Sequence, residues 1–124
     1  MQFKRKEPFR YSFTSPIQGS FRLFIEKDKE LIETKEGNME IIDLSPKGIK
    51  FRSKLNIPVE RTDLHLHITF VINEKAIEFV GKLKWKRQSA TDFIYGVSSF
   101  GDDNLAEDIV RELKSFSKKK IDES

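Results

Sequence analysis

The chain has 124 residues and a formal net charge of +3, from 23 lysine and arginine residues and 20 acidic residues. This length fits one domain with a single core, and so small a net charge gives no reason to expect bulk nucleic-acid binding. The absence of cysteine excludes disulfides, a thiol nucleophile and cysteine-ligated zinc, and it suits a cytoplasmic protein. The charged N-terminus resembles no signal peptide, and no apolar run reaches the ~20 residues of a membrane span, so we expect no membrane insertion.

The N-terminal segment, residues 1–16, contains two prolines and no sustained hydrophobic period. This pattern predicts an extended arm, which Arg5, Lys6 and Arg10 make basic. Residues 19–27 mix strand-forming and charged residues and predict the first strand. Residues 28–38 are polar and end in a Gly-Asn turn signal, so we expect them to form a connection.

Period-two alternation predicts the other strands, most clearly where Leu64, Leu66 and Ile68 alternate with polar residues. In the next strand the same alternation puts Trp85 on the core face. His65 and His67 share a strand face, which we interpret as a solvent-facing pair, because a zinc site requires more ligands. The expected strands are residues 19–27, 39–44, 49–53, 63–72, 77–86 and 93–100.

The period changes near the C-terminus, where apolar residues from Leu105 to Phe116 form one helical stripe. Asp102 or Asp103 would cap this helix. We therefore predict a mainly β fold: a six-stranded antiparallel, Greek-key-like β-barrel with a C-terminal α-helix. The expected organisation is one domain over residues 1–124, with an arm (1–16), a barrel (17–101), a helix (102–118) and a frayed tail (119–124).

The turn "DLSPKG" carries more chemistry than a hairpin needs. Asp43 can accept hydrogen bonds from the N–H groups of a ligand, and the Ser45 hydroxyl can donate or accept. Gly48 allows close approach of a ligand and a positive φ. The local alternative is that Asp43 and Ser45 only satisfy their own backbone in an Asx- or ST-turn.

An ordered set of motifs carries a family resemblance. "RKEPFR" is followed by "DLSPKG", then by "GKLKWKRQSATDFIYGVSSF" and a C-terminal helix. This order resembles the PilZ domain, in which an RxxxR arm precedes a (D/N)xSxxG turn. In the register that ends on Arg10, Lys6 replaces the first arginine and Arg5 precedes it. Lysine keeps the charge but loses the planar fork of arginine.

The resemblance implies a non-enzymatic receptor for cyclic di-GMP, coupled to a protein partner in bacterial motility or another surface-associated output. It implies no cofactor besides this ligand, no metal and no catalytic residue, and no catalytic motif stands out in the sequence. It also implies that the arm closes over the dinucleotide against the turn. The implied ligand-binding residues are Arg5, Lys6, Arg10, Asp43, Ser45 and Gly48.

Two alternatives stay open at this point. The Lys6 replacement is compatible with a degenerate member that binds no nucleotide and acts as a protein adaptor. A small basic barrel with aromatic residues can also bind single-stranded nucleic acid. We consider the nucleic-acid alternative the weaker one, because most of the aromatic residues fall on predicted core faces.

Overall fold

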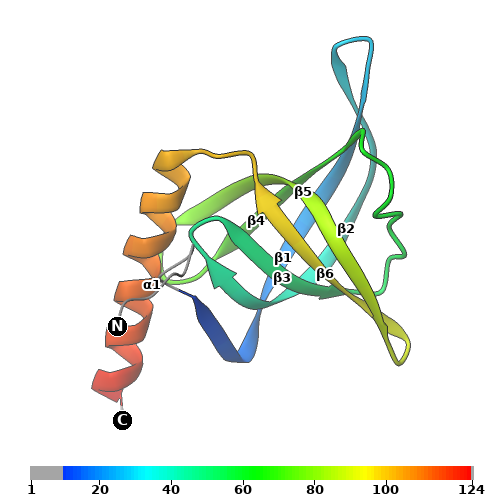
Figure 1. The fold of residues 1–124 in the computed structure, drawn as a ribbon. Helices are drawn as coiled ribbons and strands as arrows, with labels where there is room; N and C mark the ends of the chain where they lie inside the picture. The colour runs from blue at the N-terminus through cyan, green and yellow to red at the C-terminus, as the bar shows by residue number, and fades with distance from the viewer. Residues whose placement is uncertain (1–9, 124) are drawn as a thin grey trace, which may run out of the picture.

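Six antiparallel strands close into one barrel, and a single helix packs against one end of it (Figure 1). The elements are β1 (Tyr11–Lys27), β2 (Glu30–Ser45), β3 (Gly48–Ser53), β4 (Leu64–Val71), β5 (Ala76–Ser89), β6 (Asp92–Ser99) and α1 (Asp103–Glu123). The computed structural model describes residues 10–123. The strand order is β1-β2-β3-β6-β5-β4, so β4 lies beside β1. This is a Greek-key order, which confirms the predicted fold.

The barrel interior is filled by the side chains that the period-two alternation selects. In β4, Leu64, Leu66, Ile68 and Phe70 are buried, and the residues between them are half-buried or exposed. Tyr95 of β6 is fully buried; its hydroxyl donates to the carbonyl of Leu55 (2.5 Å) and accepts the N–H of Ile57 (2.7 Å). Burial raises the pKa of this hydroxyl. Tyr95 thereby holds the β3–β4 connection to the core.

The helix is capped and anchored by two carboxylates. Asp102 Oδ1 accepts the N–H groups of Asn104 (2.9 Å) and Leu105 (3.1 Å), which makes Asp102 the predicted N-cap. Glu112 is buried, and its Oε1 accepts two backbone N–H groups of the β4–β5 loop, each at 3.2 Å. Phe116 packs edge-on against Tyr11 and Phe13 at the start of β1. Helix, loop and first strand therefore form one packed unit.

The observed N-terminal strands differ from the expected ones. β1 begins at Tyr11, inside the segment expected to be an arm, and β2 includes the polar residues expected to be a connection. The β1–β2 turn lies at Asp28 and Lys29, whose φ angles are 53° and 68°. Positive φ at two successive residues is typical of tight hairpin turns. The polar residues form a strand because β1 pairs with them through its backbone, which requires no burial.

Helix α1 also extends beyond the expected end at residue 118, as far as Glu123. Within the described residues, no helix combines the length and the apolar character that crossing a membrane requires.

Candidate functional site

The turn between β2 and β3 is held rigidly at the end of the barrel next to α1. The Ser45 side chain is fully buried, and its hydroxyl donates to the carbonyl of Gly48 (3.3 Å). The N–H of Ser99, at the end of β6, donates to the carbonyl of Lys47 (3.0 Å). The expected positive φ falls on Gly101 (96°) and not on Gly48, so Gly48 does not serve the turn in that way. Ser45 does take part in a local turn bond, as the alternative interpretation expected.

Asp43 lies between two cationic side chains on neighbouring strands. In the barrel register it pairs with Ser12 of β1 and Lys50 of β3. Its Oδ2 lies 3.8 Å from Arg10 Nη1 and 3.8 Å from Lys50 Nζ. Both distances exceed the ~2.7–2.9 Å of a charge-assisted hydrogen bond. The Asp43 side chain is only 14% exposed, whereas that of Arg10 is 55% exposed.

The structure thus brings together four of the six residues implied as ligand contacts: Arg10, Asp43, Ser45 and Gly48 lie at the same end of the barrel. Arg5 and Lys6 lie outside the described residues. Their roles stay a prediction.

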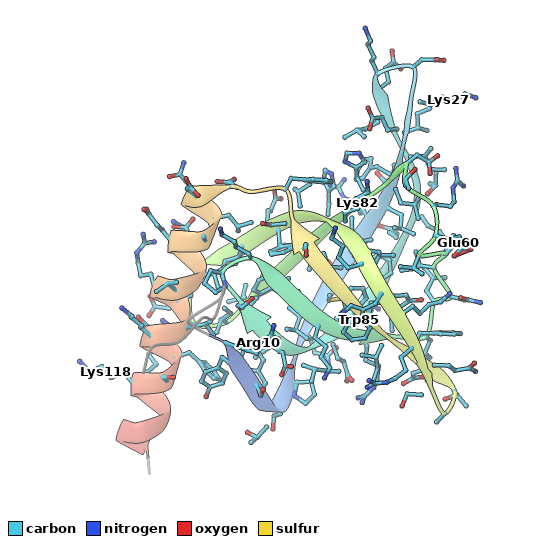
Figure 2. All side chains as sticks on the ribbon, in the orientation of Figure 1. Arg10, Lys27, Glu60, Lys82, Trp85 and Lys118 are labelled. Atoms are coloured by element: carbon cyan, nitrogen blue, oxygen red, sulfur yellow. The ribbon has the colours of Figure 1, made fainter. Side chains whose placement is uncertain are left out.

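A groove of about 520 Å³ opens beside this turn. Four cationic side chains line it, together with the indole of Trp85 and the backbone of the adjoining ends of β3 and β6. In Figure 2, Arg10 and Trp85 lie on the body of the barrel, whereas Lys27 lies at the far tip of the β1–β2 hairpin. Among the described residues no acidic side chain lines the groove. The cationic residues are Arg10, Lys47, Lys50 and Lys84.

The prediction that Trp85 belongs to the core is wrong, because β5 contains a bulge. Leu83 pairs with Val97 and Trp85 with Gly96, so Lys84 is the extra residue. After the bulge the alternation is shifted, and Trp85 is 41% exposed on the outer face. A Cβ on Gly96 would lie 2.1 Å from the indole Nε1. Only glycine therefore allows the ring to lie over β6.

The same bulge separates Lys86 from Lys82 and Lys84, with which it would otherwise share one face of β5. Lys86 points toward the β3–β4 connection, where its Nζ donates to Asn56 Oδ1 (2.7 Å) and to the carbonyl of Ile57 (3.0 Å). Sequence reasoning therefore missed Lys47, Lys50 and Trp85 as groove residues. One signal could have indicated the position of Trp85, namely Gly96 in the neighbouring strand, but it can be interpreted only when the register of the two strands is known.

The two histidines share the outer face of β4, as expected, but each is half-buried rather than freely exposed. His65 Nε2 lies 3.2 Å from Glu26 Oε1. The His67 ring packs on Phe24, with 4.3 Å between ring centroids. Desolvation is the main cause that lowers the pKa of His67, and the nearby charge of Arg22 is the second. In the described part of the chain, no three His, Cys, Asp or Glu side chains are grouped so that they could hold a metal ion.

The fold is a small closed β-barrel, and beside its β2–β3 turn lies a groove lined by cationic side chains and an exposed tryptophan. The family model of the PilZ domain matches residues 3–115, and the chain therefore belongs to the PilZ family. PilZ domains are generally non-enzymatic receptor modules for cyclic di-GMP. A comparison with curated proteins finds no match.

Proposed function

We propose that this protein is a receptor that binds cyclic di-GMP without catalysis and transmits the signal to a protein partner in motility or another surface-associated output. The observation that carries the proposal is the position of Arg10, which lies beside Asp43 at a cationic groove. Two motifs from distant parts of the sequence meet there, as arm closure over a ligand requires.

The chemistry of the groove suits the dinucleotide. Cyclic di-GMP carries two phosphodiester charges and two guanines. An arginine fork can grip a phosphate or the O6/N7 edge of guanine, and the lysines add positive charge. The exposed face of Trp85 offers a stacking surface for a base. The volume, about 520 Å³, lies within the ~300–1,000 Å³ typical of ligand sites.

Arm closure requires that Arg10 exchange its ion pair with Asp43 for contacts to the ligand. Exposed ion pairs contribute at most about 1 kcal/mol, so this exchange is easily offset by contacts to a phosphate. Arg5 and Lys6 precede Arg10 and would add further positive charge over the ligand. Because the ligand contacts the closed arrangement best, it shifts the population toward that arrangement. The partner would recognise the surface that closure creates.

Single-strand nucleic-acid binding is less well supported. Such binding uses several exposed aromatic rings, on which successive bases stack. Here five phenylalanines are buried, and Trp85 is the aromatic residue that lines the groove. The buried rings are Phe13, Phe21, Phe51, Phe70 and Phe79.

Calorimetric titration of the full chain with cyclic di-GMP tests the proposal, with two arginine variants as a matched pair. Arg10 and Arg22 have similarly exposed side chains (55% and 51%), and among the described residues Arg10 lies 3.8 Å from Asp43 and Arg22 lies 3.6 Å from Glu33. We expect Arg10→Ala to weaken binding at least about tenfold and Arg22→Ala to leave it unchanged. Both variants should keep the melting temperature of the free protein. Equal effects of the two substitutions would contradict the proposed site.

A second measurement uses the only tryptophan of the chain. If a guanine stacks on Trp85, cyclic di-GMP will change the tryptophan emission with the midpoint that calorimetry gives. No heat and no change in emission at high micromolar ligand would contradict the receptor proposal and favour the adaptor alternative.

A further inference from the structure

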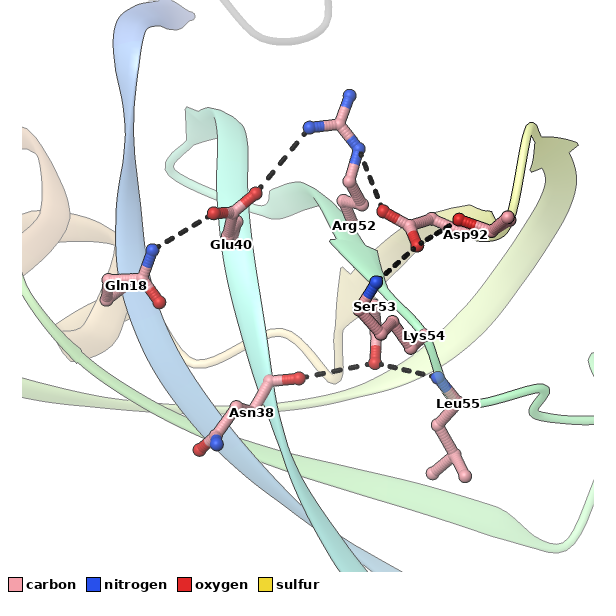
Figure 3. Close-up of polar contacts among 9 residues, drawn as sticks. Gln18, Asn38, Glu40, Arg52, Ser53, Lys54, Leu55 and Asp92 are labelled. Atoms are coloured by element: carbon pink, nitrogen blue, oxygen red, sulfur yellow. Dashed lines mark hydrogen bonds and ion pairs between the residues drawn. The ribbon is translucent and has the colours of Figure 1, made fainter.

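The N-terminal half of β2 has an open edge. β2 pairs with β1 from Tyr11↔Leu44 to Lys27↔Glu30, but with β3 only over Glu40–Ser45. In the described part of the chain, no backbone hydrogen bond joins residues 30–37 to anything on the β3 side. Figure 3 shows where the two strands separate: the Ser53 hydroxyl donates to the carbonyl of Asn38 (3.2 Å) and accepts the N–H of Leu55 (3.2 Å).

This open edge is long and accessible. Residues 30–36 are all exposed, and the β1–β2 hairpin projects from the barrel away from α1 (Figure 1). Nine strand residues, 30–38, span about 30 Å at ~3.3 Å per residue. The Asn38 carbonyl points toward Ser53. In an extended strand the backbone N–H and carbonyl groups of successive residues point to opposite sides, so Glu36, two residues before Asn38, presents its N–H and carbonyl on the open side. An added strand would find unpaired backbone groups there.

A groove of about 630 Å³ lies at the root of the edge, between β2 and residues 53–55. Met39 and Leu55 line it; Met39 is almost fully buried, and Leu55 is half-buried and offers apolar surface. Its polar rim is internally paired: Glu40 accepts from Gln18 (3.1 Å) and lies 3.5 Å from Arg52 (Figure 3). Arg52 also lies 3.9 Å from Asp92. Because these charges satisfy one another, the groove can accept an apolar side chain.

The charges along the edge determine which charge a docking segment should carry. The register of β1 against β2 shifts between Leu23 and Phe24, so Phe24 pairs with Glu33 while Arg22 pairs with Glu36. Phe24 and Arg22 share the outer face of β1, so Glu33 and Glu36 also share one face, although they are three residues apart. Residues 30–38 contain three glutamates and one lysine. Arg22 lies 3.6 Å from Glu33 on this face and offsets part of the charge, which leaves one net negative charge over Arg22, Glu33 and Glu36.

We propose that this edge, residues 30–38, is a docking site for an extended basic segment of a partner protein, which adds to the barrel as a further strand. Main-chain hydrogen bonds to β2 would supply affinity, and alternate side chains would supply specificity. Basic side chains on one face of the segment would meet Glu33 and Glu36, and apolar ones on the other face would cover Ile32 and the groove. Ile32 and its neighbour Leu31 are each 46% exposed.

A second copy of this chain fits the edge less well. Antiparallel pairing of two such edges would bring six glutamates and two lysines together, and like charges directly opposite one another destabilise a strand pair. Charged side chains and a bulge also protect an edge against indiscriminate pairing. Here the acidic side chains disfavour pairing with another acidic strand but not with a basic one. This inference concerns a different face from the cyclic di-GMP site and does not depend on that proposal.

The test uses the full chain and a nine-residue peptide in which lysine alternates with valine, followed by NMR of the backbone amides. We expect the peptide to shift the amide signals of residues 30–38 and to slow hydrogen exchange at Glu36. Non-specific attraction is disfavoured, because the protein carries a net charge of +3. A peptide with N-methyl groups on alternate residues keeps the charge but loses one edge of donors, and we expect it not to bind.

Two double variants separate the edge from general charge. Glu33→Lys with Glu36→Lys should weaken peptide binding at least about tenfold. Glu60→Lys with Glu107→Lys makes the same change in net charge at exposed positions elsewhere and should leave binding within about twofold. The proposal is overturned by no binding up to about 1 mM peptide, by equal binding of the N-methylated peptide, or by equal effects of the two double variants. Dimerisation of the protein through this edge, seen by sedimentation, would also overturn it.

Discussion

The two halves of β2 have the same backbone conformation and opposite surroundings. The C-terminal half pairs with both β1 and β3 and ends in Leu44 and Ser45, which are fully buried. The N-terminal half pairs with β1 alone and is exposed over residues 30–36. One strand therefore connects the rigid turn of the proposed ligand site to a projecting edge.

The difference shows what each half can do. A turn that must hold Asp43 beside Arg10 needs neighbours on both sides, because a site works only if its supporting residues are fixed. An edge that receives another strand must lack one neighbour. The proposed ligand site therefore lies where β2 is doubly paired, and the proposed docking edge where it is singly paired.

Leucine substitutions in the two halves of β2 should give the largest contrast. Leu44→Ala removes a fully buried side chain and should cost about 2–5 kcal/mol of unfolding free energy. Leu31→Ala changes a side chain that is 46% exposed and should stay within about 0.5 kcal/mol. Urea unfolding followed by circular dichroism measures both. A cost above about 1 kcal/mol for Leu31→Ala would mean that the N-terminal half is packed rather than free.

Ser45→Ala tests whether the turn serves the fold, the ligand or both. The substitution removes the hydrogen bond to the Gly48 carbonyl and should lower stability by about 0.5–1.5 kcal/mol. If the hydroxyl also contacts cyclic di-GMP, the affinity of the folded protein will fall as well. Thr34→Ala, which removes the bond to the Leu23 carbonyl in the exposed half, is the control and should leave affinity unchanged. A loss of stability with intact affinity would restrict Ser45 to the local role.

The sequence was sufficient to predict the elements that alternation defines. The core residues of β4, the Asp102 cap and the Greek-key barrel follow from local patterns and from closure of the sheet. The polar half of β2 was missed, because its strand conformation depends on pairing with β1 and not on its own side chains. Trp85 was misplaced, because a one-residue bulge reverses the facing of every later side chain in a strand.

For the candidate site, the motif residues could be predicted but the groove could not. Asp43, Ser45 and Gly48 occur together in one turn of the sequence. Lys50 and Trp85 reach the groove through cross-strand register, which the linear sequence does not contain.

Lys6→Arg tests the register of the N-terminal motif. Arginine at this position would restore a planar fork with the charge unchanged, so we expect affinity for cyclic di-GMP to stay equal or to rise about threefold. Lys35→Arg makes the same chemical change on the exposed half of β2 and should have no effect. A clear loss of affinity for Lys6→Arg would show that Arg5 and not Lys6 occupies the motif position.

The smallest expected effect is a pH dependence at the root of the hairpin. His67 packs on Phe24, its Nε2 is buried without a partner among the described residues, and desolvation lowers its pKa. Arg22 and His65 also lower this pKa, whereas Glu78 and Glu33 raise it. Because the folded state disfavours the protonated ring, the contribution to stability is present above the ordinary histidine pKa of about 6.5. It is lost as the pH falls and the unfolded chain binds the proton.

Glutamine substitutions separate the two histidines in this pH dependence. His67→Gln should flatten the loss of unfolding free energy between about pH 7 and pH 5, and His65→Gln should retain the loss that His67 causes. Urea unfolding at several pH values measures both slopes. An unchanged slope in His67→Gln would mean that protonation of this ring does not couple to folding.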